Sequence, residues 1–200
     1  AEPIVDVAPA DLRKDPRQVP LAEKKRLFDD YNDLIWSASD RIQTSIIRYR
    51  DQARVSYFAN SEGAYIEQED VDMSLVVVAV ARDGSDVQQA FLSLGSANDF
   101  GVLERAHERV EDVARRAVAL LSAQPVKGGT YTVVVDPRLA GVFIHEAFGH
   151  LSEADHVYEN GRLRELMQLG RRFGPPELNV FDWAAAPGLR GSYRYDAEGV

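Results

Sequence analysis

Two histidines and a glutamate within one short apolar segment carry the clearest chemical signal in the sequence. His145, Glu146 and His150 form an HExxxH pattern. Neutral imidazole nitrogens bind zinc well, and two from one segment give a pair of ligands that the backbone aligns. A glutamate beside the first histidine can take a proton from the water that zinc activates. The pattern therefore predicts a zinc hydrolase site, with His145 and His150 as metal ligands and Glu146 as the general base.

The spacing of the two histidines predicts an irregular helix. In a regular α-helix, positions five residues apart differ by about 140° around the axis, so both rings cannot face one ion. We therefore expect irregular helix geometry within residues 145–150: either an overwound or widened turn, such as a π-type turn, or an end of the helix near Gly149. Glycine permits such a distortion, and Gly149 lies next to the second histidine. An undistorted α-helix through His150 would argue against shared ligation.

A third metal ligand is harder to place, although zinc sites normally use at least three protein ligands. Glu153, Asp155 and His156 follow the motif closely, and any one of them could reach back. Each alone is more typical of a solvated loop, because charged residues are mostly exposed. An alternative for the two motif histidines is a structural role, in which they cap a helix end and hydrogen-bond to the backbone.

A cluster of acidic residues earlier in the chain is not predicted to bind metal. We expect it to form a turn between two strands. Its members are Glu67, Glu69, Asp70 and Asp72.

The elements before the motif predict an α+β fold in which helices cover an antiparallel sheet. Apolar residues recur at helical spacing over residues 21–38 and again over 102–123. Between these helices the period changes to that of strands, with a turn at Asn60–Gly63 and a hairpin signal at Asp83-Gly84. Short turns between strands predict a meander. The β-prone runs are 42–47, 55–59, 64–69, 71–82 and 87–94, and residues 1–20 are expected to be an extended lead-in.

A second, α/β-containing unit is predicted to begin after Pro125 and the two glycines that follow. Tyr131–Val135 is expected to be a strand, and Asp136-Pro137 is a good helix start, because aspartate caps a helix and proline suits its first position. This helix should run into the histidines. Beyond Asp155 the chain is loop-like, and residues 157–200 are expected to pack on something else.

Composition narrows the class of protein. The 200 residues carry a formal charge of −9, which disfavours direct binding to nucleic acid or to an anionic membrane. No apolar run approaches the length of a transmembrane helix, and the first residues do not resemble a signal peptide. Cysteine is absent, so these residues offer no thiolate ligand. Together these features predict a cytoplasmic protein.

The segment around the motif resembles the TldD/PmbA family of metallopeptidases, historically labelled modulator of DNA gyrase. The resemblance is strongest over residues 130–156, which contain HEAFGH followed by Glu-Ala-Asp, and over 190–199. Asn60–Gly63 is similar to a turn between strands in this family. Ala197 departs from the family, which has a second aspartate there, so a role for the cluster around Asp196 and Glu198 does not follow. The charge of −9 argues against direct DNA contact.

The resemblance implies a TldD-type subunit that bears the zinc motif. It implies zinc on His145 and His150, with Glu146 as the base and a cysteine farther along the family's chain as the third ligand. Residues 1–126 would then be a portion of the N-terminal domain, and residues 127–200 the beginning of the metallopeptidase domain. We expect these 200 residues alone to be inactive and to bind zinc weakly, if at all.

The resemblance also implies a substrate and a partner. The substrate would be a peptide or an unfolded polypeptide. The subunit would work in a dimer, either with a second copy or with a TldE/PmbA-type subunit. The alternative is a non-catalytic α+β binding or assembly module, with structural histidines and a partner surface on the sheet of 41–94. Zinc in the full-length protein would distinguish the two hypotheses.

Overall fold

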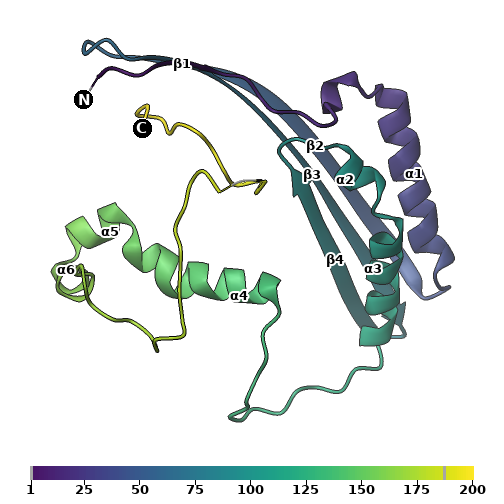
Figure 1. The fold of residues 1–200 in the computed structure, drawn as a ribbon. Helices are drawn as coiled ribbons and strands as arrows, with labels where there is room; N and C mark the ends of the chain where they lie inside the picture. The colour runs from purple at the N-terminus through teal and green to yellow at the C-terminus, as the bar shows by residue number, and fades with distance from the viewer. Residues whose placement is uncertain (1, 187) are drawn as a thin grey trace. The chain divides into compact units, whose positions relative to one another are not determined.

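The computed structural model describes residues 2–186 and 188–200, which form two compact units (Figure 1). The first, called the sheet unit, comprises the residues up to Pro125 together with Trp183–Val200. The second, called the motif unit, comprises Val126–Asp182. Helices and a mixed four-stranded sheet confirm the α+β fold class. None of the described helices combines the length and the apolar character that a membrane crossing requires.

The sheet is built around one long central strand, β3 (Tyr65–Asp83). β2 (Ile42–Ala59) and β4 (Asp86–Ser96) pair with β3 in antiparallel register. The runs 42–47 and 55–59 were expected to be separate strands, but both belong to β2. The runs 64–69 and 71–82 likewise both belong to β3, so these two divisions were wrong. The lead-in was also misjudged, because β1 (Val5–Ala8) pairs with β3 in parallel register and makes the sheet mixed. A four-residue strand with no turn beside it leaves little trace in the sequence.

Both predicted turns are confirmed. Asn60 opens the first turn, since its side-chain oxygen accepts hydrogen bonds from the backbone N–H groups of Glu62 and Ala64, each at 3.0 Å. Asp83 pairs with Asp86 in the second turn, which leaves Gly84 and Ser85 as a two-residue loop. Gly84 has a φ of +58°, a conformation that two-residue hairpins require and that glycine adopts without strain.

The core lies between one face of the sheet and two helices, α1 (Leu21–Ser37) and α3 (His107–Leu120), as Figure 1 shows. Alternate residues of β3 point to this face, as the period of two requires. Tyr31 and Ile35 of α1 belong to the same core, and both are fully buried. The buried β3 residues are Val71, Met73, Leu75, Val77, Ala79 and Ala81.

The helix expected over residues 102–123 is interrupted. A short helix, α2 (Gly101–Glu104), ends before α3 begins at His107. The Tyr31 hydroxyl lies in the break: it donates to the carbonyl of Leu103 at 2.5 Å and accepts from the N–H of Ala106 at 3.2 Å. It thereby satisfies two buried backbone groups that a continuous helix would have paired. Neither glycine nor proline marks the break, so the sequence pattern could not show it.

The opposite face of the sheet, near β1, is covered by the C-terminal segment of the sheet unit, residues 190–200. Arg190 makes two hydrogen bonds to Asp72, with its Nε 2.6 Å from Oδ1. The N–H of Tyr195 donates to the Gln68 side chain at 3.0 Å. Gly199, at a φ of +77°, lies against Phe58, where a Cβ atom would come within 2.6 Å of the ring. This part of residues 157–200 therefore packs on the sheet, as expected of a segment with few apolar runs.

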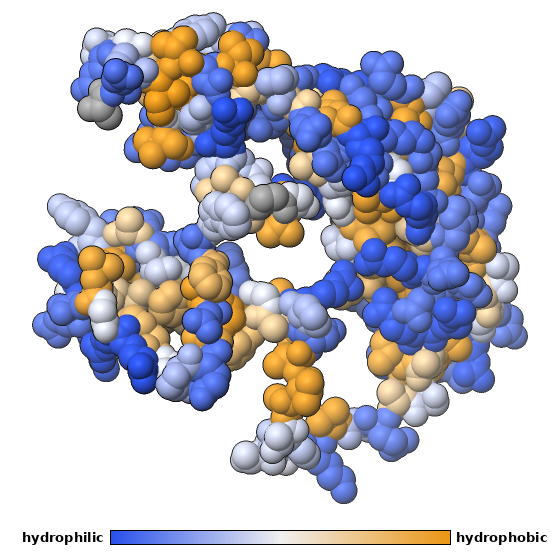
Figure 2. Space-filling model, viewed as in Figure 1, coloured by the Kyte–Doolittle hydropathy of each residue, from blue (hydrophilic) through white to orange (hydrophobic). Residues whose placement is uncertain are grey.

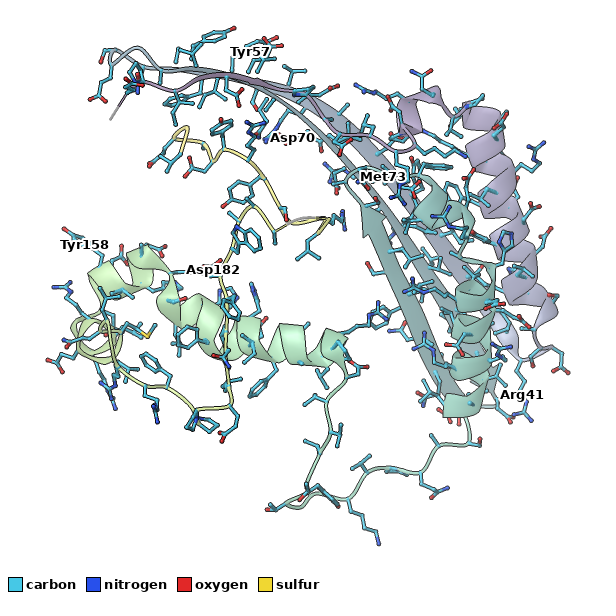
Figure 3. The ribbon with its side chains drawn as sticks, in the orientation of Figure 1. Arg41, Tyr57, Asp70, Met73, Tyr158 and Asp182 are labelled. Atoms are coloured by element: carbon cyan, nitrogen blue, oxygen red, sulfur yellow. The ribbon has the colours of Figure 1, made fainter. Side chains whose placement is uncertain are left out.

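The acidic cluster forms part of β3 and is not a turn, so that expectation was wrong. Three of its members have cationic partners on neighbouring segments, which explains how a strand can carry so many carboxylates. Arg17 lies 2.6 Å from Glu69, and Arg54 lies 3.3 Å from Asp70. Arg190 holds the pKa of Asp72 below its usual value by hydrogen bonding to it. Asp70 and Met73 can be followed along the curved sheet in Figure 3.

The motif unit consists of short helical segments. They are α4 (Pro137–Ile144), a π-helix (His145–Gly149), a 3-10 helix (His150–Ser152), α5 (Ala154–Glu159) and α6 (Gly161–Leu166). The last two replace the loop expected beyond Asp155. All residues of this unit are described, and none is buried.

The strand expected at Tyr131–Val135 does not form, and that prediction was wrong. A strand needs a neighbour for its backbone hydrogen bonds, and the described residues offer this segment none. Val134 is fully exposed and Val133 is 71% exposed. The surface of the segment that leads into α4 is accordingly hydrophobic in Figure 2.

Candidate metal centre

The helix that carries the motif begins as predicted. Asp136 is the N-cap residue of α4, and its side chain accepts a hydrogen bond from the N–H of Leu139 at 2.8 Å. Pro137 occupies the first turn, where its missing N–H costs nothing. These two residues fix where the helix starts, and so they fix the turn in which His145 lies.

The predicted irregularity at the motif is confirmed. Residues His145–Gly149 form a π-helix, in which the N–H of His150 donates to the carbonyl of His145, five residues earlier. This wider turn brings positions five apart onto one side of the helix, which a regular α-helix cannot do. Gly149 itself keeps an ordinary right-handed helical conformation, with a φ of −55°. The distortion therefore does not depend on the conformational freedom of glycine.

The π-helix brings the three motif residues together. The ring centroids of His145 and His150 lie 4.4 Å apart, with the ring planes at 70°. Nε2 of His150 is 3.7 Å from Oε2 of Glu146. One ligand atom from each of the three residues lies within 4.8 Å of the others, and all three side chains are exposed. Two imidazoles and a carboxylate thus converge on one small region of the surface.

The residues considered as a third ligand have other partners. Oε1 of Glu153 lies 2.6 Å from Nδ1 of His150, the ring nitrogen that does not face Glu146. Nδ1 of His156 lies 3.0 Å from the carbonyl oxygen of His150. Asp155 accepts a hydrogen bond from the backbone N–H of His156. These three residues form a second group of potential ligand atoms, separate from the HExxxH group.

The hydrogen bond of His156 to the backbone also raises its pKa above the usual value, and the negative charge of Asp155 adds to the effect.

Among the described residues, two groups have ligand atoms close enough to hold a metal: the HExxxH group and the group of Glu153, Asp155 and His156. Neither includes the acidic cluster of β3 or the pair Asp196 and Glu198. The side chain of Asp196 instead accepts hydrogen bonds from the N–H groups of Glu198 and Val200.

The donor set of the motif suits zinc. Zinc prefers imidazole nitrogen and carboxylate oxygen, with Zn–N bonds of about 2.0–2.1 Å in a tetrahedral arrangement. Two nitrogen ligands of one tetrahedral zinc ion lie roughly 3.3 Å apart. The donor atoms of the motif lie within 4.8 Å of one another, so only a small side-chain movement would bring them to that separation. The two histidines could supply two ligands, and a catalytic zinc site normally takes three from the protein.

The contact of Glu153 with His150 is the feature of the site that the sequence pattern did not reveal. A glutamate three residues after the second histidine was visible as a possible ligand. Its contact with Nδ1 depends on the 3-10 helix that follows the π-helix, and that helix has no signature in the sequence.

Comparison with known proteins identifies the class to which this fold and site belong. Residues 14–124 match the family model for the PmbA/TldA metallopeptidase central domain, and residues 128–200 match the model for the metallopeptidase C-terminal domain. The chain therefore belongs to the TldD/PmbA family of metallopeptidases.

Several curated relatives share this similarity across most of the chain. A metalloprotease of Synechocystis is 52% identical over 187 residues, which are 94% of this chain and 40% of the relative. A metalloprotease of Methanothermobacter thermautotrophicus is 38% identical over 99% of the chain and 43% of its own length. A zinc metalloprotease TldD homolog of Saccharolobus solfataricus is 33% identical over 80% of the chain and 36% of its own length. The chain thus spans about two-fifths of the length of these relatives.

Proposed function

We propose that this chain carries the metal-binding motif of a zinc peptidase, with His145 and His150 as zinc ligands and Glu146 as the general base. The observation that carries the proposal is the π-helix. It brings the two rings to a centroid separation of 4.4 Å, although their spacing in the sequence would turn them apart on a regular α-helix. Membership of a metallopeptidase family supports it further.

The division of labour follows from the geometry. When bound, zinc would lower the pKa of a coordinated water to about 7 and polarise the carbonyl of the peptide. Glu146 is the proton acceptor and donor. Its Oε2 lies 3.7 Å from Nε2 of His150, and therefore on the side of the ring where zinc would bind. Its carboxylate takes the proton of the attacking water and passes it to the nitrogen of the leaving amine.

The substrate and the partner belong to the same proposal. We take the substrate to be a peptide or an unfolded polypeptide, and the working form to be a dimer with a second copy or with a PmbA-type subunit. A third zinc ligand would come from outside these 200 residues. On this proposal the 200-residue polypeptide alone is inactive and binds zinc much more weakly than the full-length protein, because two imidazoles are fewer ligands than zinc sites use.

The test is the metal content and peptidase activity of the full-length protein, purified with zinc available. His145→Ala and His150→Ala should each lose zinc and activity. Glu146→Gln should keep zinc and lose activity, because the amide cannot accept the proton. Glu165→Gln, which removes an exposed carboxylate from α6, is the matched control and should retain both. Full activity in Glu146→Gln would mean that another residue is the base.

The alternative, a non-catalytic module with structural histidines, is favoured by one observation. Both His150 and His156 have hydrogen-bond partners within the motif unit itself. This hypothesis expects no zinc in the full-length wild type and unchanged partner binding in Glu146→Gln. The same metal measurement therefore separates the two functions.

A further inference from the structure

The two ring nitrogens of His150 face different carboxylates, and this asymmetry is the basis of an inference that rests on the proposed function. Nε2 lies 3.7 Å from Glu146, beside His145. Nδ1 lies 2.6 Å from Oε1 of Glu153, a hydrogen-bond distance. The two nitrogens lie on different edges of the imidazole ring. A carboxylate that is hydrogen-bonded to Nδ1 therefore cannot ligate the same ion as Nε2.

The chemistry of the carboxylate decides which nitrogen holds the proton. An ionised carboxylate only accepts hydrogen bonds, so the short contact requires a hydrogen on Nδ1 of His150. A neutral ring with its hydrogen on Nδ1 has its lone pair on Nε2, and a metal binds a neutral imidazole through that lone pair. Glu153 therefore selects the tautomer in which Nε2 is free to bind, on the side where His145 and Glu146 converge.

The position of Glu153 is itself fixed by the local backbone. It is the N-cap residue of α5, in an extended conformation that ends the 3-10 helix after the motif. Its second oxygen, Oε2, lies 3.4 Å from Nδ1 of His156. That same nitrogen donates to the carbonyl of His150, 3.0 Å away. The chain after the motif thus folds back on itself and holds Glu153 against the outer edge of the His150 ring.

We propose that Glu153 is a positioning residue for the metal centre: it is not a ligand, and it orients His150 and fixes its tautomer so that Nε2 binds zinc. Carboxylates that accept a hydrogen bond from the N–H of the ring nitrogen that does not bind the metal are a common way to orient histidine ligands, and their loss typically costs about 10- to 100-fold in metal affinity. His156 supports the arrangement through its contacts with Glu153 and with the backbone of His150.

Two measurements on the full-length protein test this role. The first is zinc affinity by competition with a chromophoric chelator, for the wild type, Glu153→Ala and Glu153→Gln. We expect Glu153→Ala to weaken binding about tenfold or more. Glu153→Gln should fall between the two, because its amide can accept from Nδ1 but can also donate to it. Glu165→Ala, which removes the same charge elsewhere in the motif unit, should bind zinc as the wild type does.

The second measurement is independent of zinc and of activity. Nitrogen NMR of labelled histidines in the metal-free protein should show His150 with its hydrogen on Nδ1 in the wild type and a mixture of tautomers in Glu153→Ala. Circular dichroism identifies a variant that has failed to fold, in which case Glu153→Gln carries the test.

The outcomes separate this inference from the proposed function. If the wild type binds zinc and both Glu153 variants bind it equally well, Glu153 does not position the ligand, and only this inference fails. A wild-type His150 with its hydrogen on Nε2 would also overturn it. If the wild type holds no zinc, the proposed function fails and the inference fails with it.

Discussion

In the sheet unit, β3 places six side chains against the helices, and each is at most 4% exposed, whereas no residue of the motif unit is buried. The contrast is not one of composition, because α4 is as apolar as a core helix. Its Leu139 and Phe143 are 57% and 61% exposed. The difference lies in whether the described chain supplies a partner for the apolar surface.

The comparison shows two ways of placing a side chain. In the sheet unit, burial of apolar area in a packed core fixes each residue. In the motif unit, local backbone and side-chain hydrogen bonds fix the site. The N–H of His150 donates to His145, the Ser152 hydroxyl donates to the carbonyl of Gly149 at 2.9 Å, and His156 donates to the carbonyl of His150. Where burial fixes the structure, truncating a side chain should lower the free energy of unfolding strongly. Where local hydrogen bonds fix it, truncating an apolar side chain should change that free energy little.

Truncating one leucine in each unit tests this contrast most strongly. Leu75→Ala removes a fully buried side chain from the centre of the sheet and should lower the free energy of unfolding by about 2–5 kcal/mol. Leu139→Ala removes an exposed side chain of the same size and should change it by less than about 0.5 kcal/mol. Urea unfolding of the 200-residue polypeptide, followed by far-ultraviolet circular dichroism, measures both. A comparable loss in Leu139→Ala would show that α4 packs into a core of its own.

The break between α2 and α3 offers a second test within the sheet unit. Tyr31→Phe keeps the packed ring but removes the hydroxyl that pairs with Leu103 and Ala106, which leaves buried backbone groups without a partner. We expect a loss of about 1–3 kcal/mol in the free energy of unfolding. Tyr49→Phe is the control, since its hydroxyl bonds to the side chain of Asp51, which has access to water. An equal loss in the two variants would mean that the break does not depend on Tyr31.

These examples show how much of the structure could be predicted from the sequence. The helix at α1, both turns, the Asp136 cap and the irregular turn at the motif are local, and local patterns predicted them. The features that failed depend on residues far apart in the chain. Tyr31 interrupts a helix more than 70 residues away, and β1 pairs with a strand about 60 residues later. The strand expected at 131–135 failed for the same reason, since its formation needs a neighbour.

The candidate site follows the same division. The irregular turn that brings His145 and His150 together could be predicted, because a spacing of five residues turns the two rings apart on a regular α-helix. The contact of Glu153 with His150 could not be predicted, because the spacing does not tell which nitrogen of His150 the carboxylate meets.

The contact between Arg190 and Asp72 predicts a modest, pH-dependent effect. Both side chains are more than a third exposed, so Asp72→Asn should cost at most about 1 kcal/mol of unfolding free energy at neutral pH. Arg190 lowers the pKa of Asp72 in the folded state, so the stabilisation is present above the ordinary aspartate pKa of about 3.9. It is lost as the pH falls through the lower, folded-state value. The difference between wild type and Asp72→Asn should therefore be constant from pH 7 to about pH 5 and shrink in more acidic urea titrations.

The smallest expected effect is that of adding a methyl group inside the motif. A Cβ atom on Gly149 would lie 3.7 Å from Nδ1 of His145, which is ordinary van der Waals contact, and the backbone there is already right-handed helical. Gly149→Ala should therefore keep the zinc affinity of the full-length protein within about twofold, much less than the 10- to 100-fold that loss of an outer carboxylate costs. Gly141→Ala in α4, where an added Cβ meets nothing within 4 Å, is the matched control. A large loss in Gly149→Ala alone would show that the π-helix needs the flexibility of glycine after all, and that hydrogen bonds by themselves do not hold the two histidines together.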